Sequence, residues 1–64
     1  MLFSVDDHVQ VIASSEIGKV LVVKDNVCVI DCSDGYEQYS FDEIVKVNAV
    51  YDKITDTYKR VPWN

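Results

Sequence analysis

The chain has 64 residues, 48% of them hydrophobic, and its eleven acidic and six basic side chains give a net charge of −5. A chain this short folds as one domain, residues 1–64, and buries only about 60% of the surface that its unfolded form exposes. It has only two glycines and one proline and no low-complexity segment. Length and composition therefore exclude a multidomain or disordered chain and leave little room for a deep pocket.

The sequence carries no signal for secretion or membrane insertion. Its first residues, MLFSVDDH, lack a basic flank and soon reach carboxylates, and no apolar run approaches the ~20 residues of a spanning helix. Cys28 and Cys32 on one strand would lie about 13 Å apart, beyond the ~7 Å limit for a disulfide. We therefore expect buried thiols and a cytoplasmic protein. A zinc site that also uses His8 is the alternative, although its spacing is poor.

Acidic residues are concentrated in the first two thirds of the chain. The net charge is −7 over residues 1–43 and +2 over residues 44–64, and residues 25–43 contain six acids and no base. Such a segment repels a phosphate backbone, because duplex binding depends on Lys and Arg. We therefore expect nucleic acid to be a poor partner. The simpler interpretation of these acids is a solvated face that keeps a small domain soluble.

Alternation of apolar and polar side chains predicts five β-strands. In the first, Val9 and Val11 lie on one face and His8 and Gln10 on the other. Gly18 precedes the second strand, at a position that favours a bulge or the close approach of another backbone. The predicted strands are residues 8–13, 19–24, 27–32, 36–41 and 45–51.

Short turns are expected to connect these strands. Residues 25–26 (Asp-Asn) form a two-residue hairpin turn, and residues 33–35 (Ser-Asp-Gly) form a second. Ser40 or Asp42 caps a single helical turn that runs through Ile44.

The C-terminal segment predicts one more hairpin. Residues 51–58, YDKITDTY, resemble the Tyr-Asp-Pro-Glu-Thr-Gly-Thr-Trp turn of minimal hairpin peptides, with Asp56 at the left-handed position. Residues 56–61 should therefore return antiparallel to the fifth strand. Pro62 prevents further regular pairing.

The stretch FSVDDHVQVIASSEIGKVLVV resembles the opening of KOW-type and related SH3-like barrels, and VCVIDCSDGYEQYSFDEIVKV is similar to small barrels attached to Smr and MutS-related bacterial proteins. The resemblance covers about residues 3–47. It implies an all-β fold: a five-stranded SH3-like barrel over about residues 3–50, with an added C-terminal β-hairpin over about residues 45–61. The Arg and Lys with which KOW domains often contact RNA are missing here. The matching positions are Asp7, Val9, Val11, Gly18, Val20, Val27, Val29, Asp34, Gly35, Tyr36, Glu37 and Glu43.

The second and third predicted strands are apolar on both faces, whereas a barrel strand should be polar outside. The expected outer set is Leu21, Val23, Cys28 and Ile30. Left bare, it would form a patch large enough to mark an interface. We expect the C-terminal hairpin to cover it with Tyr58, Val61 and Trp63, and a partner or a second copy of the chain to complete the cover.

No pattern indicates an enzyme, a cofactor or a metal site. An enzyme needs a base beside a nucleophile or paired carboxylates in a cleft, and His8, the single histidine, is better interpreted as an exposed ring paired with an acid. A calcium site is a weaker interpretation of Asp31, Ser33, Asp34 and Glu37. A second weaker interpretation is that some of the aromatic residues form a cage for a methylated amine. These are Tyr36, Tyr39, Phe41, Tyr51, Tyr58 and Trp63.

Together these patterns favour a non-catalytic intracellular protein-protein interaction module that presents an acidic face to a basic partner. One alternative is an acidic inhibitor, of phage or antitoxin type, that imitates nucleic acid. A second is a weak KOW-like nucleic-acid binder using Lys46, Lys53, Lys59 and Arg60, with Tyr58 or Trp63 for stacking. The expected partner-binding residues are Asp31, Asp34, Tyr36, Glu37, Asp42 and Glu43.

Overall fold

The computed structural model describes residues 2–32 and 35–62. Within them the chain is all-β, with one short 3₁₀ helix between the fourth and fifth strands. None of the described helices is long and apolar enough to cross a membrane. The elements in chain order are β1 (His8–Val11), β2 (Ile17–Lys24), β3 (Val27–Cys32), β4 (Gly35–Ser40), η1 (Phe41–Glu43), β5 (Ile44–Lys46), β6 (Ala49–Asp52) and β7 (Thr57–Arg60).

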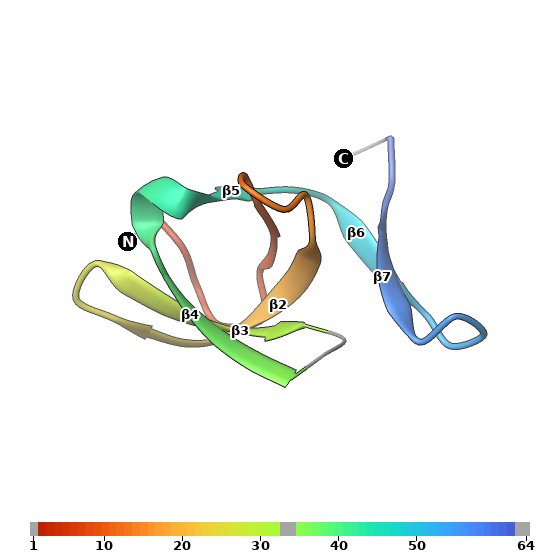
Figure 1. Ribbon diagram of the computed structural model, residues 1–64, viewed down its shortest axis with the longest axis horizontal. Coiled ribbons are helices and arrows are strands. Elements are labelled where there is room, and N and C mark those ends of the chain that lie inside the picture. The colour runs from red at the N-terminus through yellow and green to blue at the C-terminus, as the bar shows by residue number, and fades with distance from the viewer. Residues whose placement is uncertain (1, 33–34, 63–64) are drawn as a thin grey trace.

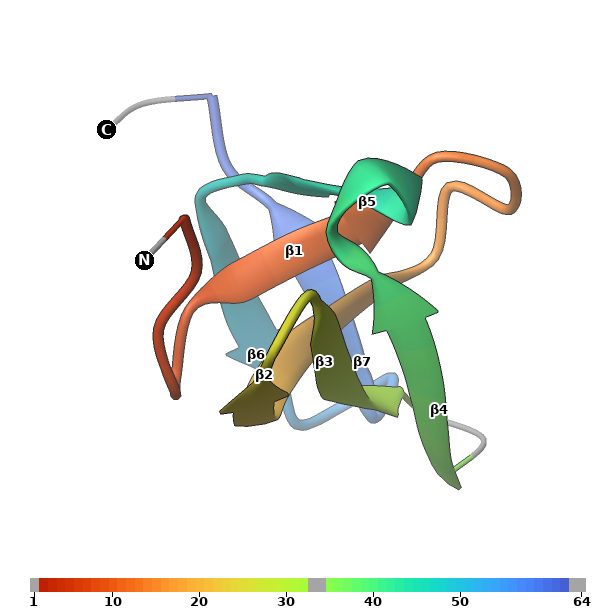
Figure 2. The same ribbon diagram turned by 90° about the vertical axis from the view of Figure 1, so that its left-hand side faces the viewer.

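The strands form two antiparallel sheets. Five of them pair in the order β4-β3-β2-β1-β5, and β6 pairs only with β7. The five-stranded sheet curls around a central space, while the β6-β7 hairpin stands beside it (Figures 1 and 2). The predicted all-β class is therefore confirmed, and so is the separate C-terminal hairpin.

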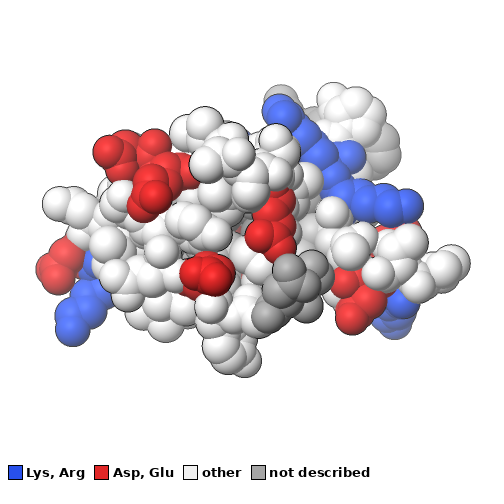
Figure 3. Space-filling model, viewed as in Figure 1, with Lys and Arg blue, Asp and Glu red and all other residues white. Residues whose placement is uncertain are grey.

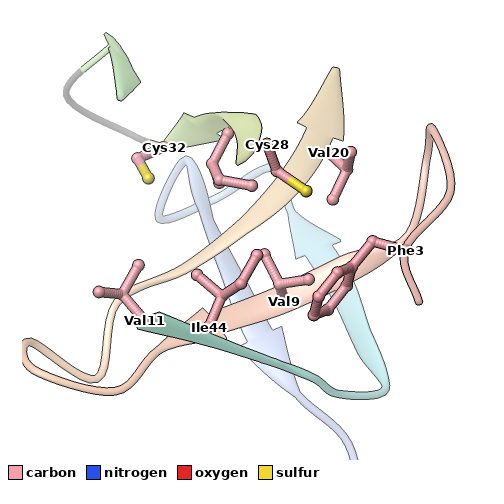
Figure 4. Packing of buried hydrophobic residues seen from close by; sticks show 8 residues of the cluster. Phe3, Val9, Val11, Val20, Cys28, Cys32 and Ile44 are labelled. Carbon is pink, nitrogen blue, oxygen red and sulfur yellow. The ribbon is translucent and has the colours of Figure 1, made fainter. Parts of the chain in front are cut away.

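The core fills the concave side of the curled sheet (Figure 4). β1, β2 and β3 each contribute alternate side chains to it. Phe3 joins from the segment before β1 and meets Phe41 edge to face, with ring centroids 5.1 Å apart. Each large apolar side chain buried in this way stabilises the fold by about 1.5–3 kcal/mol. The buried apolar residues are Phe3, Val9, Val11, Val20, Cys28, Ile30, Cys32, Ile44 and Val47.

Gly18 lies where β2 and β3 approach most closely. A Cβ atom at this position would lie 2.5 Å from Ile30 Cγ2 and 2.7 Å from the Asp31 carbonyl oxygen. Two residues further on, the pairing register with β3 shifts between Val20 and Val22, as in a β-bulge. The sequence prediction of a close approach at Gly18 is confirmed, and the irregularity in the register follows a little later.

The predicted assignment of faces is wrong for both strands. Cys28 and Ile30 were expected on the outer face, but both are fully buried in the core. Val23, beyond the bulge, also packs against the core. The residue pairs that cross the outer face join Val22 to Val29 and Lys24 to Val27. Both strands therefore carry apolar residues on two faces, as predicted, but the outer apolar residues are Val22, Val27 and Val29.

The C-terminal hairpin covers a different part of the sheet from the one expected. Its Tyr58 ring lies against His8 of β1, with centroids 5.4 Å apart, and β7 contacts β2. Val22, on the outer apolar face, remains 48% exposed. The hairpin therefore covers the His8 end of the outer face. Trp63, which was also expected to cover the outer apolar residues, is outside the described residues.

The predicted fifth strand, residues 45–51, is wrong as a single element. Its first part, β5, pairs with β1, and its second part belongs to the hairpin as β6. The chain leaves the main sheet at Val47, which is buried and donates its N–H to the His8 carbonyl oxygen at 3.0 Å. The Asn48 carbonyl oxygen then accepts from the Val61 N–H at 2.9 Å. The alternating segment 45–51 therefore contributes strands to both sheets.

Most of the predicted turns are confirmed. Asp25 (φ 54°) turns β2 into β3, and Asp56 (φ 56°) holds the left-handed position in the C-terminal hairpin. Ser40 immediately precedes η1, as expected for the cap. The predicted turn at residues 33–35 lies largely outside the described residues. Gly35 opens β4 with φ 122°, a conformation that favours glycine.

We predict that Gly18→Ala lowers the free energy of unfolding by about 1–3 kcal/mol, because the new methyl group overlaps backbone as well as side-chain atoms. Urea denaturation followed by tryptophan fluorescence measures this change. Gln38→Ala, at an exposed position on β4, is the control and should stay within about 0.5 kcal/mol of the parent. Equal stability of the two variants would contradict the close approach described above.

Candidate functional site

The residues predicted to form one acidic recognition corner lie in separate parts of the fold. Asp31 faces Tyr36 across the β3-β4 pair, whereas Glu37 projects from the opposite face of β4. Asp42 and Glu43 belong to η1, beyond the far end of β4. Six strand residues at about 3.3 Å each separate the two ends by roughly 20 Å. Figure 3 accordingly shows acidic side chains in several separate groups, and Asp34 is outside the described residues.

One end of β4 borders a small apolar groove next to η1, which we call the η1 groove. Its volume is about 260 Å³. Ile12, 58% exposed, follows β1 directly, and its N–H donates to the Glu43 carbonyl oxygen at 3.0 Å, which fixes the loop beside η1. The lining residues are Val11, Ile12, Ala13, Tyr39, Asp42 and Glu43.

The two acids of η1 also hold this helix in place. The Glu43 carboxylate accepts from the Ser40 N–H at 2.8 Å and from the Ser40 hydroxyl at 2.7 Å. The same hydroxyl lies 2.7 Å from Asp42 Oδ1. The backbone N–H of Ser40, followed by its hydroxyl, lowers the pKa of Glu43. Glu43 is therefore a structural cap as well as part of the groove.

Tyr39 is the aromatic residue of the η1 groove, and negative charge gathers around it. Burial raises the pKa of its hydroxyl, and Cys32 and the carboxylates of Glu37, Glu16 and Glu43 raise it further. Glu16 comes from the loop between β1 and β2, so these acids converge from three parts of the chain. The field around Tyr39 consequently favours a cation.

Three of the six basic residues pair with acids elsewhere in the fold. The described residues contain three ion pairs, which join Lys19 to Asp6, Lys46 to Asp7 and Lys59 to Asp52 at 3.6, 3.4 and 2.8 Å. The Lys59 side chain, more than any other contact, lowers the pKa of Asp52. Among the described residues, Glu16, Glu37 and Asp42 have no basic partner within 4.0 Å. Of these three acids, Asp42 lines the η1 groove and Glu16 and Glu37 act electrostatically on its Tyr39, whereas other acids without a basic partner, such as Asp31, lie elsewhere.

A second and larger recess lies between the main sheet and the β6-β7 hairpin, and we call it the hairpin cleft. Its volume is about 840 Å³. Its floor is part of the outer face of β1, β2 and β3, and its wall is the hairpin. The lining residues are Asp6, His8, Lys19, Asp31, Cys32, Val50, Tyr51, Asp56 and Tyr58.

The aromatic residues do not form one cage. Tyr39 and Phe41 pack against the core, and Tyr36 is 74% exposed on β4. Tyr51 and Tyr58 meet edge to face, with centroids 5.4 Å apart, in the wall of the hairpin cleft. Of the predicted aromatic set, this tyrosine pair lines the hairpin cleft and Tyr39 lines the η1 groove.

The described residues contain no group of three or more His, Cys, Asp or Glu side chains placed to hold a metal ion. Two of the oxygen ligands considered for calcium, from Ser33 and Asp34, lie outside these residues. Cys28 and Cys32 are buried thiols that form no disulfide. Burial also raises the pKa of Cys28, which makes its thiol less reactive.

Sequence reasoning missed two residues that line the η1 groove, Ile12 and Ala13, and the negative charge that Glu16 adds near Tyr39. These residues were interpreted as the end of a strand and as a loop, and no signal in the sequence connects them with η1.

Comparisons with family models, with curated proteins and with solved structures find no match to this chain. The two recesses themselves are therefore the basis for any functional proposal.

We predict that Glu43 links stability to pH. Because its folded-state pKa lies below its ordinary value of 4.5, the cap stabilises the fold fully above that pH. The stabilisation is lost as the pH falls through the folded-state value. Urea unfolding over a series of acidic to neutral pH values should show a loss of stability on acidification that is smaller in Glu43→Gln. An unchanged pH profile in the variant would show that the cap contributes nothing.

Proposed function

We propose that the protein is a non-catalytic protein-interaction module that binds a basic segment of a partner protein in the η1 groove. The observation that carries this proposal is the position of the residual negative charge. Asp42, which has no basic partner among the described residues, lines an apolar recess beside the Tyr39 ring, and Glu16 and Glu37 add negative charge near that ring. Exposed apolar surface framed by charge of one sign is typical of a recognition site.

The groove suits a lysine or arginine side chain. The aliphatic part of such a side chain packs on Ile12 and Ala13 while its charged end reaches the surrounding carboxylates. Exposed ion pairs contribute only about 0–1 kcal/mol each, so we expect modest affinity. The charges act mainly on the rate of association, by attracting a basic partner over a distance.

The topology supports the same class of protein. A five-stranded antiparallel sheet in the order β4-β3-β2-β1-β5, with a single 3₁₀ turn between β4 and β5, agrees with the SH3-like barrel that the KOW-type resemblance implies. The buried thiols suit a cytoplasmic location. Fold alone does not define a function, so the proposal depends on the groove.

The two alternative functions that involve nucleic acid have weaker structural support. Of the bases that a KOW-like binder would use, Lys46 and Lys59 pair with acids, and Arg60 contacts the Gln10 side-chain oxygen at 3.4 Å. The two ion pairs reduce the positive charge available to phosphates. An inhibitor that imitates nucleic acid would use its carboxylates for the target, whereas Glu43 is engaged in capping η1.

We predict that Glu37→Gln slows association with the partner about two- to fivefold and flattens the dependence of the rate on salt, because one attracting charge is lost. Affinity capture from the native cell supplies candidate partners. Surface plasmon resonance at several salt concentrations then measures the association rate of each. Ile12→Ser, which alters only exposed apolar surface, should instead speed dissociation.

Asp25→Asn is the matched control for this experiment. It also removes one negative charge, but it lies in the β2-β3 turn, and asparagine tolerates the positive φ found there. The control should therefore bind like the parent. If Glu37→Gln and Asp25→Asn behave alike, net charge rather than the η1 groove governs association, and the proposal is wrong.

A further inference from the structure

The floor of the hairpin cleft is a row of polar side chains that crosses the outer face of the sheet. Strand register pairs His8 of β1 with Lys19 of β2, and Lys19 with Asp31 of β3. Directly opposite partners in antiparallel strands have side chains on the same face. The row therefore presents an imidazole, an ammonium and a carboxylate side by side.

The wall above this row is aromatic and acidic. Tyr58 lies over His8, and Tyr51 meets Tyr58 edge to face. The Tyr51 hydroxyl donates to Asp56 Oδ1, which fixes its ring at the mouth of the cleft. Tyr51 is 48% exposed, so part of its ring remains available to a ligand.

The charge of the cleft favours a cationic ligand. Three carboxylates (Asp6, Asp31 and Asp56) and one ammonium (Lys19) line it, which leaves an excess of two negative charges before His8 is counted. Lys19 is already paired with Asp6 at 3.6 Å, so its charge is partly neutralised. Among the described residues, the half-buried Asp31 carboxylate has neither a hydrogen bond nor an ion pair. Asp31 is therefore the carboxylate of the cleft that has no partner among the described residues.

We propose that the hairpin cleft binds a guanidinium group, stacked on Tyr51 and hydrogen-bonded to the Asp31 carboxylate. A guanidinium is planar, so it stacks on an aromatic ring, and its parallel N–H groups match the two oxygens of a carboxylate. A phosphate or carboxylate ligand would be repelled by the excess of acids. A purely apolar ligand would leave the polar floor without partners. This inference does not depend on the η1 groove.

The test is an NMR titration of the isotopically labelled full chain with three probes. They are methylguanidinium, the capped tripeptide acetyl-Gly-Arg-Gly-amide and the same peptide with neutral citrulline in place of arginine. We expect the two guanidinium probes to shift the backbone amides of Lys19, Asp31, Tyr51 and Tyr58, and the citrulline peptide to leave them in place. Tighter binding of the arginine peptide than of methylguanidinium assigns the group to a protein partner, and equal binding assigns it to a small molecule.

Variants separate this site from simple charge attraction. Asp31→Asn should weaken binding of the arginine peptide about fivefold, and Tyr51→Leu, about threefold. Asp25→Asn, with the same loss of charge, should bind like the parent. The amide spectrum of each variant reports whether it is folded. Equal binding of the citrulline peptide, or unchanged binding by Asp31→Asn in a folded protein, overturns the proposal.

Discussion

The pairing of β2 with β3 is the contact on which the rest of the structure depends. Gly18 has no side chain, so Ile30 and the backbone at Asp31 approach closely enough to complete the core. The bulge after Val20 then brings Val23 of β2, which lies opposite Cys28 of β3, to the core side of the sheet. In a domain this small, nine buried apolar residues supply most of the hydrophobic stabilisation, so there is little reserve if this register slips.

The same register also organises the surface. It aligns polar side chains across the outer face, where the hairpin covers them and forms a recess. On the core side of β4, the same pairing leaves Tyr39 partly buried, near acids that come from β4, η1 and the β1-β2 loop. Three of the six bases pair with Asp6, Asp7 and Asp52 instead of with these acids. Two chemically different recesses therefore arise from one curled sheet and one appended hairpin.

Local chemistry made much of this fold predictable. The turns at Asp25 and Asp56 and the cap at Ser40 depend on the conformational preferences of single residues, which the sequence displays directly. The break at Val47 could not be foreseen, because the alternation of side chains continues unchanged across it. Assigning faces failed in β2 because the bulge moves its later residues to the opposite face, and in β3 because both faces are apolar and the alternation does not show which one is buried. The acids were grouped by closeness in sequence, whereas strands carry them to different faces and ends.

The order of strands leaves β4 at the border of the sheet, with one of its two sides unpaired. Such a border exposes a row of backbone donors and acceptors to which another copy of the chain can add a strand. Glu37 is the single charged residue in β4, and it lies near the middle of the strand. A second copy of β4 paired with this border would bring an identical carboxylate close to it, so the charge of Glu37 opposes the pairing of two such borders.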